Sequence, residues 1–187
     1  TLWRRSRTLY WRAETSADDD ERERFARRGR EIAERALARN AAGVEGHYYA
    51  AVNAGIYAQA VGVLRALAEG VEGPFLEHLR FVRRKALEWD DGAPATVMGR
   101  YHFELPWPRR DIGESIRILT EVVRRYPRNL RARLYLAEAL LEEDHPEESL
   151  RILEEIEQSA GSDPAEARLV KERAARLRQR VERALAD

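Results

Sequence analysis

Two stretches of the chain repeat one pattern and decide the fold: TVMGRYHFELPWPRRDIGESIRILTEVVRRY at residues 96–126 and RLYLAEALLEEDHPEESLRILEEI at residues 133–156. Each contains a small residue in its first half, Gly99 or Ala137, and a second one after a turn, Ser115 or Ser149. The two serines lie 34 positions apart. Small residues let two helices approach closely, and larger apolar residues fill the space to the next pair. The pattern therefore predicts stacked pairs of antiparallel helices.

The rest of the chain fits the same plan. Ala, Leu, Arg and Glu dominate, and no segment alternates apolar and polar residues, so no sheet is expected. Proline, glycine and Asp/Asn turns separate the predicted helices, which span 2–13, 20–39, 44–69, 76–89, 95–105, 112–126, 130–143, 147–159 and 164–186.

A period of 34 residues is that of the tetratricopeptide repeat. The predicted fold class is therefore all-α, a tetratricopeptide-like α-solenoid of about four antiparallel helix pairs with a C-terminal capping helix. We expect a single helical-repeat domain over residues 1–187. Its clearest repeats lie at 94–127 and 129–161, and its capping helix at 164–186.

Composition and charge exclude several classes of protein. The 33 basic and 33 acidic residues give a net charge of zero, whereas nucleic-acid-binding proteins usually carry a basic excess, so no nucleic-acid partner is expected. All basic residues except Lys85 and Lys171 are arginine, which indicates a GC-rich genome. The absence of cysteine excludes disulfides and thiolate metal sites. The only methionine is Met98, so we expect a leader or tag to have preceded Thr1.

One stretch requires a membrane check. Residues 46–64 carry no formal charge and are about long enough to span a bilayer. They also contain His47, Asn53 and Gln59, whose polar side chains are costly in lipid. We therefore predict a helix buried within a folded domain and no membrane span.

Five segments carry a family resemblance: EGHYY at 45–49, GRYH at 99–102, LPWP at 105–108, IGES at 112–115 and NLRARLYLAE at 129–138. Together they resemble divergent bacterial tetratricopeptide-like proteins, of which the TatT components of tripartite (TRAP-type) transporters are the nearest that we can name. They are similar in broad pattern to the eukaryotic regulator-of-microtubule-dynamics proteins. The resemblance covers roughly residues 20–160.

The TatT-like resemblance implies an exported helical protein, periplasmic or lipid-anchored, that is able to oligomerise. It also implies a cavity for a small, partly apolar ligand or for a partner protein. Without this resemblance, a cytoplasmic location is the expectation.

The uncharged helix has a polar and aromatic side. Tyr49 and Asn53 are four residues apart and share one face, while Tyr48 lies on the neighbouring face. These three side chains either belong to a packed core with satisfied hydroxyls or line a ligand cavity.

The connection after residue 104 is longer than its counterpart. Gly99 to Ser115 spans 16 positions, against 12 from Ala137 to Ser149, and two prolines stiffen the insertion around Trp107. Trp107 is either a plug over the core or a contact residue for a partner.

Charged side chains recur at equivalent positions of the two repeats. In ordinary repeat arrays the first helix of each pair lines the concave groove. Aligning Gly99 with Ala137 places charged residues in that groove: Arg100, Glu104, Arg131, Glu138 and Glu142. These charges either pair between adjacent repeats or bind a partner, an arginine holding a carboxylate through paired donors.

Catalytic signatures are missing from the sequence. It contains no His-Glu-x-x-His, no glycine-rich phosphate loop and no Gly-x-Ser-x-Gly elbow. We therefore expect no enzyme, no cofactor and no metal. The predicted function is a non-enzymatic binding scaffold that takes a partner protein segment in its groove or a small ligand in a cavity, as in an accessory component of a transport system. The alternative is a structural scaffold that forms homo-oligomers.

Overall fold

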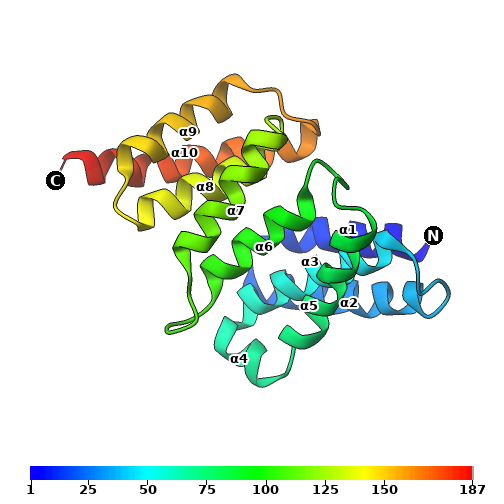
Figure 1. Ribbon diagram of the computed structural model, residues 1–187. Helices are drawn as coiled ribbons and strands as arrows, with labels where there is room; N and C mark the ends of the chain where they lie inside the picture. Colours follow the sequence, from blue (N-terminus) through cyan, green and yellow to red (C-terminus); the bar gives the residue numbers. More distant parts are fainter. Residues whose placement is uncertain (187) are drawn as a thin grey trace. The chain divides into compact units, whose positions relative to one another are not determined.

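In a computed structural model, residues 1–186 are described, and this part of the chain is helical without any strand. The contacts between helices divide the chain into two compact units, residues 1–87 and 88–187. The expectation of one domain over the whole length stays a prediction, and each unit is described by itself (Figure 1).

Unit 1 is built around one central helix. Its helices are α1 (Leu2–Thr15), α2 (Asp19–Leu37), α3 (Val44–Val61), α4 (Val63–Ala68) and α5 (Glu72–Lys85). α3 packs against α1, α2 and α5, and a run from Tyr48 to Ala54 is buried. The prediction that the uncharged stretch 46–64 forms a buried helix is confirmed as far as α3 extends, whereas Leu64 beyond it is exposed. Within residues 1–186, no helix is long and apolar enough to cross a membrane.

Two predicted helix boundaries in unit 1 are wrong. The expected helix 44–69 is broken at Gly62, whose φ of 91° is incompatible with a continuing helix, so that α3 and α4 are separate. The helix expected at 76–89 lies four residues earlier, and positive φ angles at Asp90, Asp91 and Gly92 form the turn that follows it.

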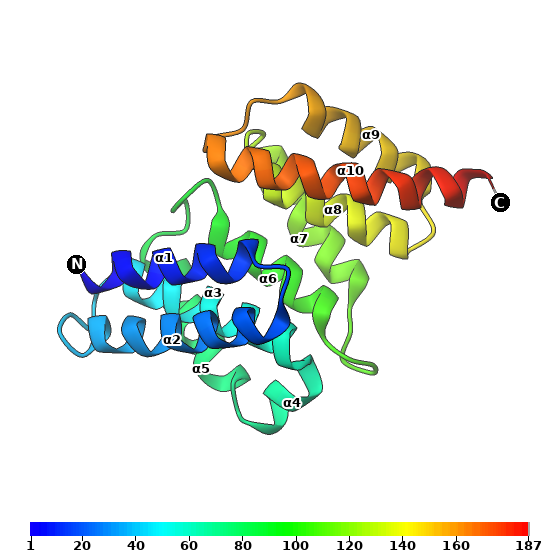
Figure 2. The ribbon, with the colours of Figure 1, turned by 180° about the vertical axis from the view of Figure 1, so that it is seen from behind.

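Unit 2 contains the two clear repeats and the last helix. Its helices are α6 (Ala93–Glu104), α7 (Ile112–Arg125), α8 (Leu130–Glu142), α9 (Pro146–Gln158) and α10 (Pro164–Ala186). α7 starts where Asp111 accepts a hydrogen bond from the Glu114 amide, and α8 where Asn129 accepts one from Ala132. Figure 2 shows α10 running beside α8 and α9, against which it packs.

The packing inside each repeat follows from the small residues. Ser149 is fully buried, and its hydroxyl donates to the carbonyl of Ala137 at 2.7 Å. A Cβ at Gly99 would lie 2.6 Å from Cγ of Leu119, which is itself fully buried. The predicted close approach of the paired helices is therefore confirmed, and with it the fold class.

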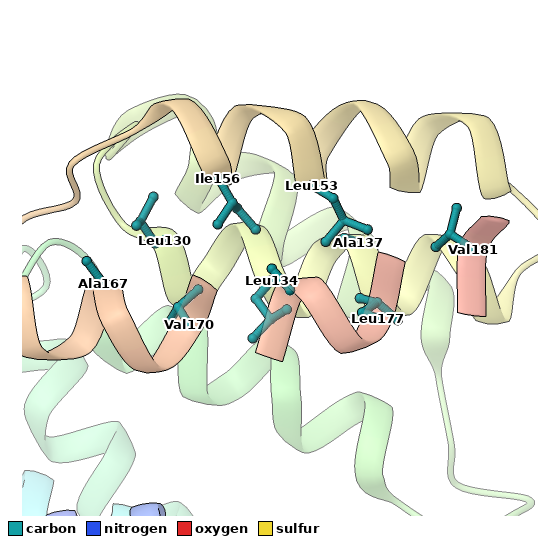
Figure 3. Packing of buried hydrophobic residues seen from close by; sticks show 10 residues of the cluster. Leu130, Leu134, Ala137, Leu153, Ile156, Ala167, Val170, Leu177 and Val181 are labelled. Carbon is teal, nitrogen blue, oxygen red and sulfur yellow. The ribbon is translucent and has the colours of Figure 1, made fainter. Parts of the chain in front are cut away.

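The last helix covers the second repeat. Its buried stripe meets apolar residues of α8 and α9 in one cluster (Figure 3): Leu130, Leu134, Ala137, Leu153, Ile156, Ala167, Val170, Ala174, Leu177 and Val181. Because α8 and α9 would otherwise leave this face open to water, α10 completes the core of unit 2.

Asn129 ties three segments together at one end of unit 2. Besides capping α8, its amide nitrogen donates to the carbonyl of Asp91 at 2.8 Å and to Oγ1 of Thr96 at 3.1 Å. Ser162, in the turn before α10, is hydrogen-bonded to the Asp91 carboxylate. These bonds fix the start of α6 against the starts of α8 and α10.

Candidate partner-binding face

Arg100 is the centre of the charged face in unit 2. Its guanidinium is bonded to Glu138 of α8 and, at 2.6 Å, to Glu104 one turn further along α6. The aromatic rings of Phe103 and Tyr135 lie 4.7 and 4.8 Å from the guanidinium carbon, measured to the ring centroids. Only 19% of the Arg100 side chain is exposed, so these contacts fix the orientation of its guanidinium group.

The electrostatics of Arg100 follow from these contacts. Burial alone would lower its pKa, but the nearby carboxylates of Glu138 and Glu104 outweigh burial and raise the pKa above its ordinary value. The charge is therefore permanent. The Nε atom of Arg100 is buried and makes no hydrogen bond, so the side chain has an unused donor.

Further Arg–Glu pairs link neighbouring segments of the same unit. Arg110 bonds to Glu142 of α8 at 2.9 Å, and Arg131 of α8 bonds to Glu166 of α10. The structure thus brings together the predicted residues Arg100, Glu104 and Glu138, and it places Arg131 in a separate pair. Of the two alternatives for these charges, pairing is observed, whereas their role in binding stays a prediction.

Trp107 lies at the apex of a turn that is held in place. Leu105 before it is buried, and the amides of Arg109 and Arg110 donate to the carbonyl of Pro106 at 2.9 and 3.2 Å. The Arg110 side chain returns to donate to the Phe103 carbonyl at 2.9 Å. The indole itself is 88% exposed, so the interpretation of Trp107 as a plug over the core is wrong. A contact role for it stays a prediction.

The predicted residues of α3 are buried in unit 1. Tyr49 stacks on Trp3 of α1 with ring centroids 6.2 Å apart, and Tyr48 lies edge-on to Tyr49. Asn53 is fully buried, and its amide nitrogen donates to the Tyr49 carbonyl at 2.7 Å and to Ser6 at 3.1 Å. This placement agrees with the packed-core alternative, and a ligand-binding role for these three residues stays a prediction.

A second buried detail explains why α1, α2 and α3 approach so closely. The hydroxyl of Ser6 donates to the carbonyl of Gly29 at 2.8 Å, and a Cβ at Gly29 would lie 2.1 Å from Oδ1 of Asn53. Only glycine leaves room for the Asn53 amide at this position.

Sequence reasoning missed one polar cluster because its members come from different helices. Nδ1 of His47 in α3 lies 2.9 Å from Nδ1 of His78 in α5, and Nε2 of His78 lies 2.9 Å from Glu34 of α2. Residues 31 positions apart on unrelated helices give no spacing signal. In the described part of the chain, no group of three or more His, Cys, Asp or Glu side chains is arranged to hold a metal ion.

Comparison with known families agrees with the helix pairs and the short turns. The family model "Tetratricopeptide repeat" matches residues 109–174, so the second part of the chain is of the tetratricopeptide type. The model "Regulator of microtubule dynamics protein 1-3" matches residues 1–116, more than half of the 187-residue chain. The chain therefore belongs to the regulator of microtubule dynamics protein 1-3 family. No curated protein matches it in sequence.

Proposed function

We propose that the protein is a non-catalytic scaffold whose unit 2 binds a segment of a partner protein on the face formed by α6 and α8. Tetratricopeptide-type domains are generally protein-binding scaffolds without catalytic activity, and the match at residues 109–174 lies in this unit. The observation that supports the proposal is the Arg100 arrangement: a permanently charged, ring-stacked guanidinium with one unused donor.

Recognition works by exchange of ion pairs. Glu104 belongs to the same helix as Arg100, and an i,i+4 ion pair within a helix contributes only about 0.2–0.5 kcal/mol to stability. A carboxylate of the partner segment displaces Glu104 and receives two donors from Arg100, while Glu138 keeps the guanidinium in place. The order of charged residues along the face formed by α6 and α8 determines which partner segments bind.

A charge-exchange variant tests this proposal. The double variant Arg100→Glu, Glu138→Arg keeps an ion pair between α6 and α8 but reverses its direction, so the fold is expected to hold. Partners are identified by cross-linking the wild-type chain in its own cell extract, and each is then purified for titration. We expect the exchange to weaken binding by at least about tenfold, the value of one charge-assisted hydrogen bond.

The matched control is the pair Arg124 and Glu121 on α7, exchanged in the same way. This pair is exposed and lies within one helix, away from the Arg100 contacts. Circular dichroism checks that both double variants keep their helical content. Equal affinity of the two variants for the partner would refute the proposed face.

The alternative function is a scaffold for homo-oligomers, and the exposed Trp107 favours it. A tryptophan on a rigid turn is a typical anchor of a protein interface. Sedimentation of the wild-type chain and a Trp107→Ser variant over a range of concentrations distinguishes the two functions. Oligomers that are lost in the variant support the alternative, and monomers at every concentration argue against it.

A small-ligand function in a transport system rests on the TatT-like resemblance alone. It would use Tyr48, Tyr49 and Asn53, which in unit 1 are buried among helices. Native mass spectrometry of protein from its own source tests it: a small mass released on activation supports a ligand, and a clean apo chain favours the partner-binding face. Regulation of microtubule dynamics is what the family name states of its members, and for this chain we propose protein binding only.

A further inference from the structure

The two units of the chain carry opposite net charges, although the whole chain is neutral. Residues 1–87 contain 16 basic and 12 acidic side chains, whereas residues 88–187 contain 17 basic and 21 acidic ones. A positive surface of unit 1 in one copy of the chain can therefore face a negative surface of unit 2 in another copy. The exposed charges without a partner inside the chain decide which surfaces these are.

The positive surface is the outer face of α1. Four arginines of this helix are exposed: Arg4, Arg5, Arg7 and Arg12. Among residues 1–186, none of these arginines forms an ion pair with a carboxylate, and the one acidic residue of α1, Glu14, is buried. The outer face of α1 therefore carries positive charge that nothing in the described part of the chain neutralises.

Arg5 and Arg12 form a stripe along this face. They are seven residues apart, so they lie on the same side of the helix, about 10.5 Å from each other along its axis. The guanidinium carbon of Arg12 lies 4.0 Å from the centre of the Phe25 ring of α2, and this contact keeps the charge in position. The exposed and uncharged Thr8 lies between the two arginines.

The negative surface is the outer face of α9. Glu147 and Glu154 are exposed, and neither forms an ion pair with another residue of the described chain. They are also seven residues apart, so their carboxylates repeat the spacing of about 10.5 Å found on α1. Arg151 lies between them and is likewise exposed and unpaired within residues 1–186.

The two faces match in the order of their charges. Along its stripe α1 presents a positive, a neutral and a positive side chain, and α9 presents a negative, a positive and a negative one. The neutral position is able to receive the central arginine. The hydroxyl of Thr8 donates to the carbonyl of Arg4 at 3.1 Å, which leaves its oxygen as an acceptor for Arg151.

We propose that the outer face of α1 binds the outer face of α9 in a second copy of this chain, with Arg5 opposite Glu154 and Arg12 opposite Glu147. This order makes the two helices antiparallel, so that their dipoles attract. Because the two surfaces differ, the contact is heterologous, and a third copy adds in the same way. The assembly goes beyond the proposed function, since each added copy brings a further α6–α8 face to a multivalent partner.

The contact between copies is weak and depends on ionic strength. Exposed ion pairs contribute little each, and salt screens them. In sedimentation velocity we expect the wild-type chain to associate at about 0.02 M salt, and its dissociation constant to rise at least about tenfold at about 0.5 M salt. A wild-type chain that stays monomeric at low ionic strength would overturn the proposal.

A mixing experiment with two charge-reversed variants tests the pairing itself. The first variant carries Arg5→Glu and Arg12→Glu. The second carries Glu147→Arg and Glu154→Arg. Each variant alone brings like charges together, so each should be monomeric where the wild-type chain associates. An equimolar mixture should associate again, because the reversed α1 of the first variant faces the reversed α9 of the second, and the two unchanged faces also match.

The matched control is the variant Arg80→Glu, Arg84→Glu, which changes the net charge as much as the first variant does. Both arginines are exposed on α5, and among residues 1–186 neither has an ion pair. This control and Trp107→Ser should associate like the wild-type chain. Loss of association in the control would show that net charge acts rather than the α1 face, and loss in Trp107→Ser would assign the contact to the indole; either result refutes the proposal.

Two further results would also contradict this pairing. One is association of either charge-reversed variant alone, and the other is a mixture that stays monomeric while circular dichroism shows both variants to be folded. Both variants keep the α6–α8 face unchanged, so titrating them with the cross-linked partner tests the proposed function independently of this assembly.

Discussion

Replacing Gly99 by alanine tests the packing argument for the repeat. The new Cβ would lie 2.6 Å from Cγ and 2.8 Å from Cδ2 of Leu119, far inside van der Waals contact. Leu119 is fully buried in α7, where side chains are closely packed, so either its side chain or the two helices must shift. Overpacking of this kind costs about 1–3 kcal/mol, and the better helix propensity of alanine returns roughly 1 kcal/mol. We expect a net loss of up to about 2 kcal/mol.

The same substitution at Gly113 is the matched control. Gly113 is also helical, but the only neighbour of its Cβ within 4 Å would be Oδ1 of Asp111, at 3.7 Å. Alanine there meets no obstacle and should raise stability by up to about 1 kcal/mol. The assay is urea unfolding followed by circular dichroism. If both variants changed stability in the same direction, the close approach of α6 and α7 would not explain why residue 99 is small.

Three further outcomes are expected. Asn129→Ala removes a helix cap and two other hydrogen bonds, so it should lower the free energy of unfolding in urea by about 2–3 kcal/mol. Asp111→Ala removes only a helix cap and should cost about 1 kcal/mol, so equal losses would contradict the role of Asn129 in joining segments of the chain. The hydrogen bond from Tyr57 lowers the pKa of Glu69. At pH values above the ordinary glutamate pKa this contact therefore stabilises the fold, and the stabilisation is lost as pH falls through the lowered pKa. NMR titration of the Glu69 carboxyl checks the direction of the shift. Trp107→Ser should leave the free energy of unfolding within about 0.5 kcal/mol, because the indole is exposed, and a larger loss in urea would show that it packs in solution.

The candidate site was only partly predictable from the sequence. Aligning Gly99 with Ala137 placed Arg100 and Glu138 at equivalent positions, and the structure brings these two side chains into contact. The alignment gave no means of deciding whether the charges pair or remain available, because that depends on side-chain reach across helices. For the same reason it did not find the His47–His78 contact, which joins two helices with no common period.

The local pattern of residues determined the helices and their pairing. Capping residues, prolines and the 34-residue spacing act over a few turns of chain, so they are visible in the sequence. Tertiary structure decided what each side chain meets. It placed the ring of Tyr49 against α1, left Trp107 in water and brought Nδ1 of His47 to 2.9 Å from Nδ1 of His78, because burial and hydrogen-bond partners are set by segments far apart in the chain.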